Sequence, residues 1–256
     1  MAHMNSETKI ITIIGIITVA VIALGLYFAG GAGTPESTVK VIPANLIHPD
    51  SFRLTGTDPK LQIVEFGDFQ CPACAAEAPN IAKLIAAYGK NIDYVFRIIP
   101  IHEHSKEGAA AAYAAGEQGK FFEMGNILFA KQDEWTATGA VPETFFSTYA
   151  ASLGLDMAKF KADYKNNQAK YYASVDRDSA DASSMGINST PTLIFNGNQV
   201  ATGALTYEHL QQIVEAAIAG NGGAPSKAAA APSAQVTSTP PAGSNSLNMG
   251  FGAAAK

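Results

Sequence analysis

Cysteine is nearly absent from this 256-residue chain, and the two that occur lie three residues apart in Cys71-Pro72-Ala73-Cys74. A structural zinc site is disfavoured, because it needs two more ligands and the sequence has no second Cys-x-x-Cys. A purely structural disulfide is also disfavoured, since closing so short a loop removes little chain entropy and stabilises a fold poorly. The scarcity of cysteine therefore indicates that this pair performs redox chemistry.

Positive charge is scarce as well. The 17 Lys and Arg residues are outnumbered by 22 Asp and Glu, and the net charge of -5 argues against binding to nucleic acid, which requires a basic patch. No internal repeat is visible. With 47% hydrophobic residues, the chain can bury one substantial core, or one core with a large insert.

Charge of either sign is missing from residues 10–29. A helix of this length spans about 30 Å, the thickness of the hydrocarbon core of a bilayer, so we expect a transmembrane anchor. A cleavable signal peptide is the alternative, because the small residues at positions 29–32 suit a signal peptidase. No cysteine follows the run, which excludes a lipoprotein anchor. Either interpretation places the cysteine pair outside the cytoplasm, where a disulfide can persist.

Composition also suggests the domain boundaries. The opening Met1-Ala2-His3-Met4 resembles an expression-vector scar, so we assign residues 1–9 to a scar and a short cytoplasmic N-terminus. Residues 30–38 form a linker of small residues. Residues 220–256 form a tail too poor in apolar side chains to fold, which we expect to be disordered. The folded domain is predicted to span residues 39–219.

Hydrophobic periodicity places the cysteine pair between a strand and a helix. Residues 61–66 form an apolar run typical of a buried strand, and a helical pattern with one apolar face follows the pair. A second strand over residues 92–101 completes a β-α-β unit, whose crossover implies parallel pairing. We expect Pro79 to kink the helix, because proline removes a hydrogen bond and clashes one turn back.

The remainder of the domain is predicted to be a helical insert followed by a hairpin and a last helix. Helical signals fill residues 104–186, with helices over 106–116, over 121–135, from Pro142, after an Asp156 cap, and over 168–185. Strands 192–195 and 199–202 are joined at Asn196-Gly197, a strong hairpin signal. Thr206 can cap the last helix. The order is β-α-β, a multi-helix insert, then β-β-α, which is an α/β fold.

The position of the cysteine pair accounts for its expected reactivity. Cys71 is predicted to lie at the helix N-terminus, where unpaired backbone N–H groups and the macrodipole favour the thiolate. Pro72 suits the first turn, because its missing donor is not needed there. The thiolate is the attacking species in disulfide exchange, so a lowered pKa makes such a site reactive.

The chain resembles the DsbA-like branch of the thioredoxin superfamily from about Leu61 to Ala219. Three separated segments carry this resemblance in the same order: Val64 to Cys74, which ends in Cys-Pro-Ala-Cys; the block from His104 to Trp135, with Gln118-Gly119-Lys120-Phe121-Phe122; and Ile187 to Thr192, with Thr190-Pro191. The resemblance implies a thioredoxin-like fold with a multi-helix insertion between its two halves.

The resemblance also assigns roles to the residues around the pair. Cys71 would be the exposed nucleophile and Cys74 the buried resolving thiol, and the two would form the Cys71-Cys74 disulfide in the oxidised protein. Thr190 and Pro191 would form the cis-proline loop that packs beside them. Together with Pro72 and Ala73, this loop would contact an extended peptide substrate.

Glu65 occupies the strand position at which the superfamily places a buried acid. Burial there would raise its pKa, so that Glu65 carries the proton of Cys74 during exchange. The alternative is a Glu65 that points to solvent from a half-buried strand. We favour the buried acid, because central parallel strands are covered on both faces.

Two residues depart from the strongly oxidising archetype of this branch. Ala73 stands where that protein has a histidine, and the loss of this positive neighbour implies a less stabilised thiolate. At the position of Thr190 the archetype has an aliphatic residue. In having threonine there, this chain is more like the membrane-tethered and isomerase-type relatives. The net direction therefore stays open between an oxidase and a reductase or isomerase. The rival from another class is a metal-delivery module that uses Cys71 and Cys74 as soft ligands.

These features together predict a membrane-tethered, extracytoplasmic thiol:disulfide oxidoreductase that introduces disulfides into exported proteins. Its partners would be unfolded or reduced exported proteins and a membrane oxidase of the DsbB or VKOR type. No organic cofactor or metal is implied, and we expect a monomer. His102 and His104 are expected to have supporting or surface roles, because no other ligand-type cluster accompanies them.

Overall fold

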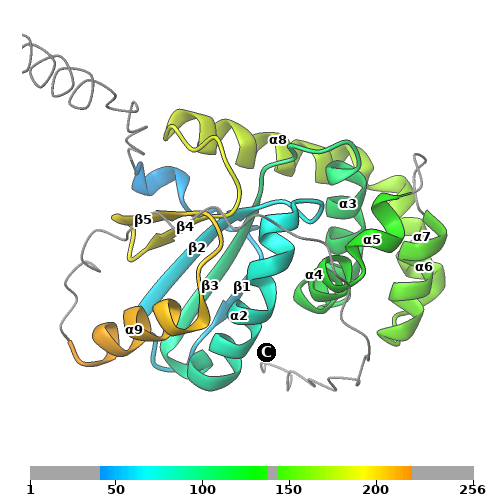
Figure 1. The fold of residues 1–256 in the computed structure, drawn as a ribbon. Helices are drawn as coiled ribbons and strands as arrows, with labels where there is room; N and C mark the ends of the chain where they lie inside the picture. The colour runs from blue at the N-terminus through cyan, green and yellow to red at the C-terminus, as the bar shows by residue number, and fades with distance from the viewer. Residues whose placement is uncertain (1–40, 138–142, 221–256) are drawn as a thin grey trace, which may run out of the picture.

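The computed structural model describes residues 41–137 and 143–220. The predicted scar, apolar span and linker, and the tail beyond Gly220, lie outside these residues. Within the two described ranges, no helix has both the length and the apolarity needed to cross a membrane. The described chain forms one sheet with helices on both faces and a block of helices at one side (Figure 1).

The sheet has the strand order β1-β3-β2-β4-β5. The strand bounds are β1 Arg53–Thr55, β2 Leu61–Gly67, β3 Ile92–Ile98, β4 Thr192–Phe195 and β5 Gln199–Thr202. β2 and β3 are parallel, as predicted, and their register sets Glu65 opposite Phe96. The other three pairs are antiparallel. The hairpin between β4 and β5 turns at Asn196 and Gly197, which have φ of 47° and 73°, values that Asn and Gly tolerate best.

Two strand boundaries differ from the prediction. β1 is an edge strand that the sequence analysis missed, because three residues are too few to show alternation. The strand predicted over 92–101 ends at Ile98. Pro100 cannot donate to the sheet, and the N–H of Ile101 donates instead to the carboxylate of Asp68 at 3.2 Å.

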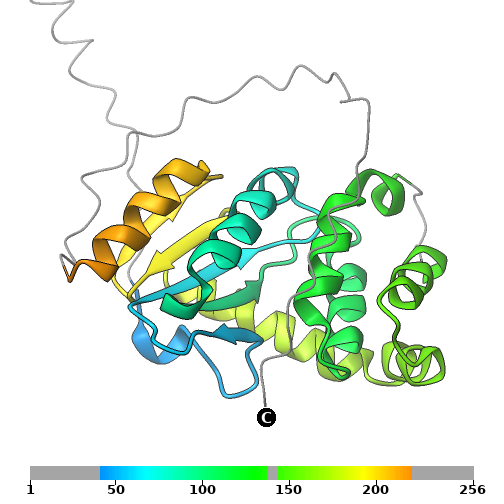
Figure 2. The same cartoon turned by 90° about the horizontal axis from the view of Figure 1, so that it is seen from below.

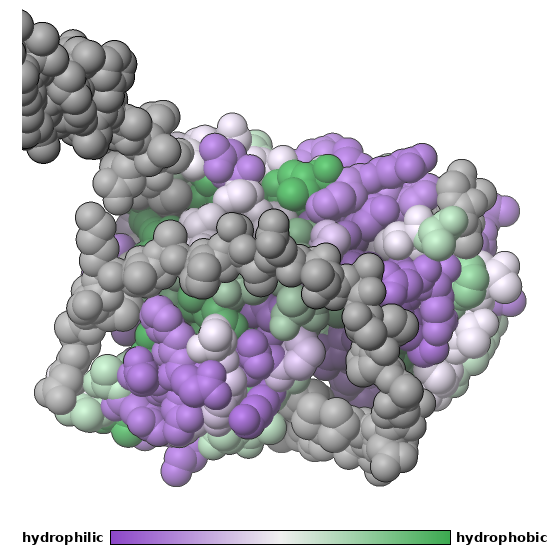
Figure 3. All heavy atoms as spheres, in the orientation of Figure 1, coloured by the Kyte–Doolittle hydropathy of each residue, from purple (hydrophilic) through white to green (hydrophobic). Residues whose placement is uncertain are grey.

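Helices cover the sheet unequally. α2 (Pro72–Tyr88) and α9 (Tyr207–Ile218) lie on one face, and α8 (Gln168–Ser184) lies on the other (Figures 1 and 2). α2 continues through Pro79 to Tyr88 and buries Ile81 and Leu84 in the larger core. Short 3-10 helices, Pro43–Asn45 and Gly89–Asn91, complete this half of the molecule. Hydrophilic side chains dominate much of the visible surface (Figure 3).

The insert between β3 and β4 contains most of the helices. Besides α8 they are α3 Ser105–Gly116, α4 Phe121–Ala130, α5 Gln132–Thr136, α6 Glu143–Ser152 and α7 Met157–Asn166. The single helix predicted over 121–135 is wrong. The backbone leaves the helical conformation at Lys131 (φ -115°, ψ 25°), and Trp135 donates back to the carbonyl of Leu128 at 2.9 Å.

The predicted helix caps are confirmed where the structure describes them. Asp156 caps α7 by accepting from the N–H groups of Ala158 and Lys159, and Thr206 caps α9. Pro142, the predicted start of α6, lies outside the described residues. The fold is thus the predicted thioredoxin-like arrangement, with α2 carrying the cysteine pair to the end of β2 and the helical insert beside it.

Candidate active site

The cysteine pair lies where β2 ends and α2 begins. Cys71 is the N-cap residue of α2 and Pro72 is its first residue, as expected for a proline that needs no hydrogen-bond partner in the first turn. Both cysteines are free thiols in this structure. Cys71 is only 5% exposed and Cys74 1%. The expectation that Cys71 is exposed is therefore wrong, because the backbone carbonyl of Thr190 lies against its sulfur.

The two thiols have opposite pKa shifts. The hydrogen bond from the Cys74 thiol is the largest cause that lowers the pKa of Cys71 to about 5, and Thr190 and the backbone at Cys74 and Ala73 add to it against the effect of burial. The same bond, burial and the charge of Glu65 raise the pKa of Cys74 far above its usual range. At neutral pH Cys71 is therefore a thiolate and Cys74 a thiol, which supports the predicted order of attack.

The loop at residues 189–192 lies directly against the nucleophile. The Thr190–Pro191 peptide bond is cis, as predicted, and the carbonyl oxygen of Thr190 lies 3.5 Å from the Sγ of Cys71, from which it accepts while Cys71 is protonated. Thr192 Oγ1 donates to the Ser189 carbonyl at 2.8 Å, and the N–H of Gly203 donates to the Pro191 carbonyl at 2.9 Å. These bonds fix the loop beside the pair, so the structure brings Cys71, Thr190 and Pro191 together.

Glu65 is buried behind the pair. Its side chain is 3% exposed, so the alternative in which it points to solvent is excluded. The hydroxyl of Tyr94 donates to its Oε2 at 2.7 Å. Burial raises the pKa of Glu65 to about 7, partly opposed by the Tyr94 bond and reinforced by the charge of Cys71. The expected rise in pKa is confirmed, and a carboxyl that titrates near neutrality can both give and take a proton.

Glu77 is a second buried acid, which the sequence analysis missed. It lies one turn after Cys74 on α2 and is 0% exposed. Its Oε1 accepts from the N–H of Leu205 at 2.9 Å, while its Oε2 has no hydrogen-bond partner in the described chain. Burial raises its pKa to about 9, with the charge of Glu65 adding to the rise. The sequence signal for its burial is its spacing, because Glu77 precedes Ile81 by four residues and so lies on the same apolar face of α2.

Asp68 ties together the two loops that flank the pair. Its buried carboxylate accepts from Ser105 Oγ and the N–H of Gln70, and lies 2.7 Å from Nδ1 of His102. His104 is buried nearby, and its backbone N–H donates to Gln70. Both histidines therefore lie in supporting positions. Within residues 41–137 and 143–220, no group of three His, Cys, Asp or Glu side chains could hold a metal ion.

Comparison with known proteins agrees with this geometry. The sequence profile of the family described as Thioredoxin matches residues 54–216. The chain belongs to the thioredoxin family. Among solved structures, a thioredoxin-like oxidoreductase from Silicibacter pomeroyi DSS-3 is 26% identical, covering 70% of this chain and 98% of that one with a TM-score of 0.58. Oxidised BdbD from Bacillus subtilis is 22% identical, covering 71% and 97% with a TM-score of 0.58, and shares the fold.

Curated relatives carry another name. A protein named Na(+)/H(+) antiporter NhaA 1, from Mycobacterium sp. (strain KMS), is 33% identical over 196 residues, which are 73% of this chain and 31% of that protein. The chain thus spans about a third of the length of this relative. The antiporter name describes that whole protein. The likeness to the thioredoxin-like oxidoreductase from Silicibacter pomeroyi, in contrast, extends over 98% of that protein and supports thiol–disulfide exchange.

Proposed function

We propose that this protein is an extracytoplasmic thiol:disulfide oxidoreductase that forms disulfides in exported proteins. The observation that carries the proposal is the separation of the two thiol pKa values, with Cys71 lowered to about 5 and Cys74 raised. In this proposal residues 10–29 tether the domain to the membrane, and a membrane oxidase of the DsbB or VKOR type reoxidises the pair. The protein acts as a monomer without a cofactor.

The proposed cycle follows from the chemistry of the two sulfurs. A substrate thiolate attacks the Sγ of Cys71 in the Cys71-Cys74 disulfide, and Cys74 leaves and takes up a proton. A second substrate thiolate then attacks the substrate sulfur of the mixed disulfide and expels Cys71 as a thiolate. Two electrons pass from the substrate to the pair. A low thiol pKa makes Cys71 a good leaving group, which favours release of the oxidised substrate.

Proton transfer to Cys74 is the proposed role of Glu65. Cys74 is a poor leaving group unless it is protonated, because its pKa is raised. The charge of Glu65 acts on Cys74, and its own pKa of about 7 lets the carboxyl donate near neutral pH. Pro72 and Ala73 follow Cys71 in the first turn of α2, and the Thr190–Pro191 loop lies beside its sulfur through the Thr190 carbonyl. We assign peptide contact to these four residues.

The proposed direction depends on how strongly the thiolate is stabilised. A Cys71 pKa of about 5 lies between about 7 in thioredoxin and about 3.5 in DsbA. A more stable thiolate stabilises the reduced form and makes the disulfide more oxidising. We therefore expect a reduction potential between those of the two proteins, above about -270 mV and below about -120 mV. The absence of a histidine at Ala73 accounts for the intermediate position.

Equilibration with glutathione tests the direction. The reduced fraction of the Cys71-Cys74 pair is measured in glutathione buffers of graded potential, with Cys74→Ala as the control that cannot form the internal disulfide. A midpoint in the stated window supports an oxidase. A midpoint at or below that of thioredoxin would replace the proposal with an extracytoplasmic reductase on the same fold.

A further inference from the structure

A cavity of about 610 Å³ lies between α2, α4 and the sheet. It is lined by residues of β1, β2, β3 and both helices, and none of its lining residues comes from Cys71–Cys74 or the Thr190–Pro191 loop. Its volume falls within the range of about 300–1,000 Å³ that is typical of small-molecule sites. The cavity is therefore a separate space behind the redox pair, large enough for a ligand.

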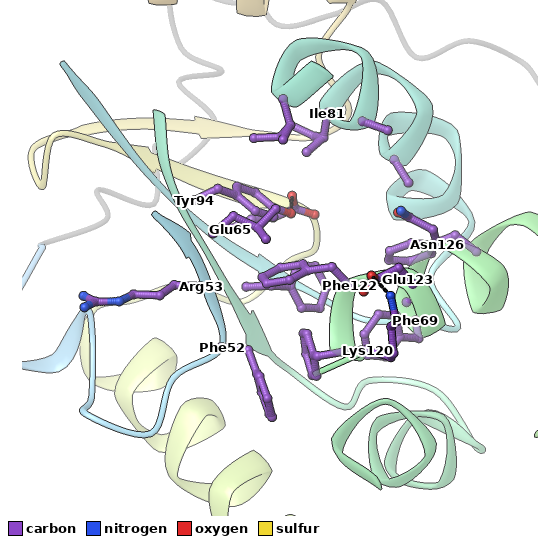
Figure 4. A pocket seen from close by; sticks show the side chains of 18 of the residues that line it. Phe52, Arg53, Glu65, Phe69, Ile81, Tyr94, Lys120, Phe122, Glu123 and Asn126 are labelled. Atoms are coloured by element: carbon purple, nitrogen blue, oxygen red, sulfur yellow. Dashed lines mark hydrogen bonds and ion pairs between the residues drawn. The ribbon is translucent and has the colours of Figure 1, made fainter. Parts of the chain in front are cut away.

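The walls of this cavity are mainly aromatic. Phe52, Tyr94 and Phe122 line it, and the rings of Tyr94 and Phe122 pack against one another with their centroids 5.7 Å apart (Figure 4). Ala78 and Ala82 line it from α2, and their small side chains leave the space open. A wall of this kind suits a flat aromatic ring, since ring pairs gain from offset and edge-to-face contact beyond the area that they bury.

Glu65 is the acid at the inner end. Its carboxyl group meets the Tyr94 hydroxyl there (Figure 4), and this bond to Oε2 is the one hydrogen bond of that carboxyl within the described residues. At the rim Lys120 and Glu123 are paired at 2.8 Å and neutralise one another. The guanidinium of Arg53 points away from Glu65 (Figure 4). Oε1 of Glu65 is therefore available to a ligand.

The charges around Glu65 favour a cation. The groups whose charges act on Glu65, Glu77 and Tyr94 are carboxyls and thiols of this same interior, and no basic side chain of the described chain is among them. An apolar space that ends in an uncompensated carboxylate attracts a positive group, and aromatic ring faces attract it further.

We propose that this cavity binds a small aromatic amine, with its ring against the wall that Tyr94 and Phe122 form and its ammonium group on the carboxylate of Glu65. The proposal does not depend on the direction of disulfide exchange, because Glu65 is the one residue that the cavity shares with the proposed exchange machinery. Its charge selectivity comes from one side chain, and its shape selectivity comes from the small residues of α2.

The proposed site has a defined pH dependence. Glu65 must be ionised to hold the ammonium, and its pKa is about 7. An alkylammonium stays charged to about pH 10, so affinity rises with pH as Glu65 loses its proton. The expected gain is about tenfold between pH 6 and pH 8. The other groups that interact with Glu65 are Tyr94, Glu77, Cys71 and Cys74. Over this range Cys71 is already ionised and the other three stay protonated.

Three matched probes test the proposal on the full-length protein by isothermal titration calorimetry. Tryptamine carries the ring and the ammonium, 3-ethylindole carries the ring alone, and indole-3-propionate replaces the cation by an anion. At pH 8 we expect tryptamine to bind at least about tenfold more tightly than 3-ethylindole, and indole-3-propionate to bind most weakly. Equal affinities for tryptamine and indole-3-propionate, or no binding of tryptamine, would overturn the proposal.

Three variants locate the probe. Ala82→Phe fills the cavity and should abolish tryptamine binding, while Ala86→Phe adds the same ring on the exposed side of α2 and should leave binding unchanged. Glu65→Gln should remove both the preference for tryptamine over 3-ethylindole and its pH dependence. If Ala82→Phe does not fold, Ala78→Leu obstructs the same wall with a smaller side chain. Unchanged tryptamine affinity in a folded cavity variant contradicts the assignment.

Discussion

Two buried polar clusters lie on opposite faces of β2 and β3. On one face Arg97 donates to Asp178 at 2.7 Å and to Asp181 at 2.7 Å, and also to the carbonyls of Asn45 and Leu46. On the other face Glu65 has a single hydrogen-bond partner among the described residues, the neutral Tyr94. The register sets Glu65 opposite Phe96, and the next pair sets Phe66 opposite Arg97. Adjacent positions of one strand pair thus hold a compensated charge and an uncompensated one.

The two clusters suit different roles. The Arg97 cluster suits a structural role, and the Glu65 cluster suits acid–base chemistry. The Arg97 cluster joins β3 to α8 and to the segment before β1, and each of its charges has an opposite partner, so removing one leaves the others buried and unpaired. Within residues 41–137 and 143–220, the Glu65 cluster consists of carboxyl groups, thiols and the Tyr94 phenol. With no base of the described chain to hold them ionised, burial raises the pKa of Glu65 to about 7 and that of Glu77 to about 9, and a pKa near 7 suits a group that exchanges protons at neutral pH.

In the Glu65 cluster, the largest expected effect comes from substitution of the two cysteines. Cys71→Ala should abolish exchange and trap no substrate, because the nucleophile is lost. Cys74→Ala should accumulate mixed disulfides with substrate proteins, because Cys71 still attacks and the resolving thiol is missing. Non-reducing electrophoresis of the two variants, after incubation in the reduced form with a disulfide-containing substrate protein, measures this: Cys71 attacks one sulfur of the substrate disulfide and the other substrate sulfur leaves as a thiolate. Equal trapping by both variants would reverse or remove the assigned order of attack.

In the Arg97 cluster, the largest effect on the free energy of unfolding should come from Arg97→Met. This change leaves Asp178 and Asp181 without their cation, and breaking a buried ion pair by removing one partner costs about 3–5 kcal/mol. Urea unfolding measures the loss in free energy of unfolding. Arg53→Met, on the exposed edge strand β1, is the matched control and should change it by less than about 0.5 kcal/mol. Similar losses in the two variants would show that the Arg97 cluster does not hold the fold.

Glu65→Gln should raise the free energy of unfolding at high pH, whereas Arg97→Met lowers it. The folded pKa of Glu65 is raised from 4.5 to about 7, so wild-type stability is fully present below pH 4.5 and is lost as pH rises through 7. The variant lacks this loss and should gain about 2–3 kcal/mol relative to wild type between pH 4 and pH 8.

The same variant should slow proton transfer to Cys74. We expect the exchange rate to fall by about tenfold or more at pH 7, since general acid–base catalysis contributes at least this much. Unfolding at both pH values and stopped-flow exchange with a reduced peptide give the two readings. A variant that is less stable than wild type at pH 8 and equally fast in exchange would show that Glu65 is an ordinary core residue.

The smallest effect should come from Glu77→Gln. The amide keeps the oxygen that accepts from Leu205 and removes the group that titrates near 9. We expect stability within about 0.5 kcal/mol of wild type at pH 7 and loss of the upper titration step by NMR. Glu77→Ala leaves the Leu205 N–H unsatisfied and should cost about 1–3 kcal/mol. Equal losses in both variants would mean that the charge of Glu77, rather than its oxygen, holds the loop.

Local signals in the sequence predicted most of the fold. The apolar runs at 61–66 and 192–195 became β2 and β4, and the caps at Asp156 and Thr206 form as the side-chain chemistry requires. The missed elements depend on partners far along the chain. β1 exists because β3 offers it an edge, and the break at Lys131 exists because Trp135 packs back on α4.

The site was predictable to the extent that motifs define it. Cys71, Cys74 and Pro191 belong to short patterns that carry their own chemistry, and Glu65 stands out as a charge within an apolar strand. Glu77 is marked only by its spacing from Ile81, which is a weak signal because a glutamate in a helix is usually on the solvent side. Neither its missing partner nor the cavity in front of Glu65 has a sequence signature, since both depend on how α2, α4 and α9 pack.

The pH dependence of Cys71 alkylation in the reduced wild-type protein tests the central claim most directly. The claim is that an interior without a base separates the titrations of the buried groups around a stabilised thiolate. The rate of reaction with iodoacetamide should rise with a midpoint near pH 5, where Cys71 ionises, with a second, smaller step near pH 7 as Glu65 loses its proton. A single midpoint near pH 9, the ordinary value for a thiol, would contradict the account.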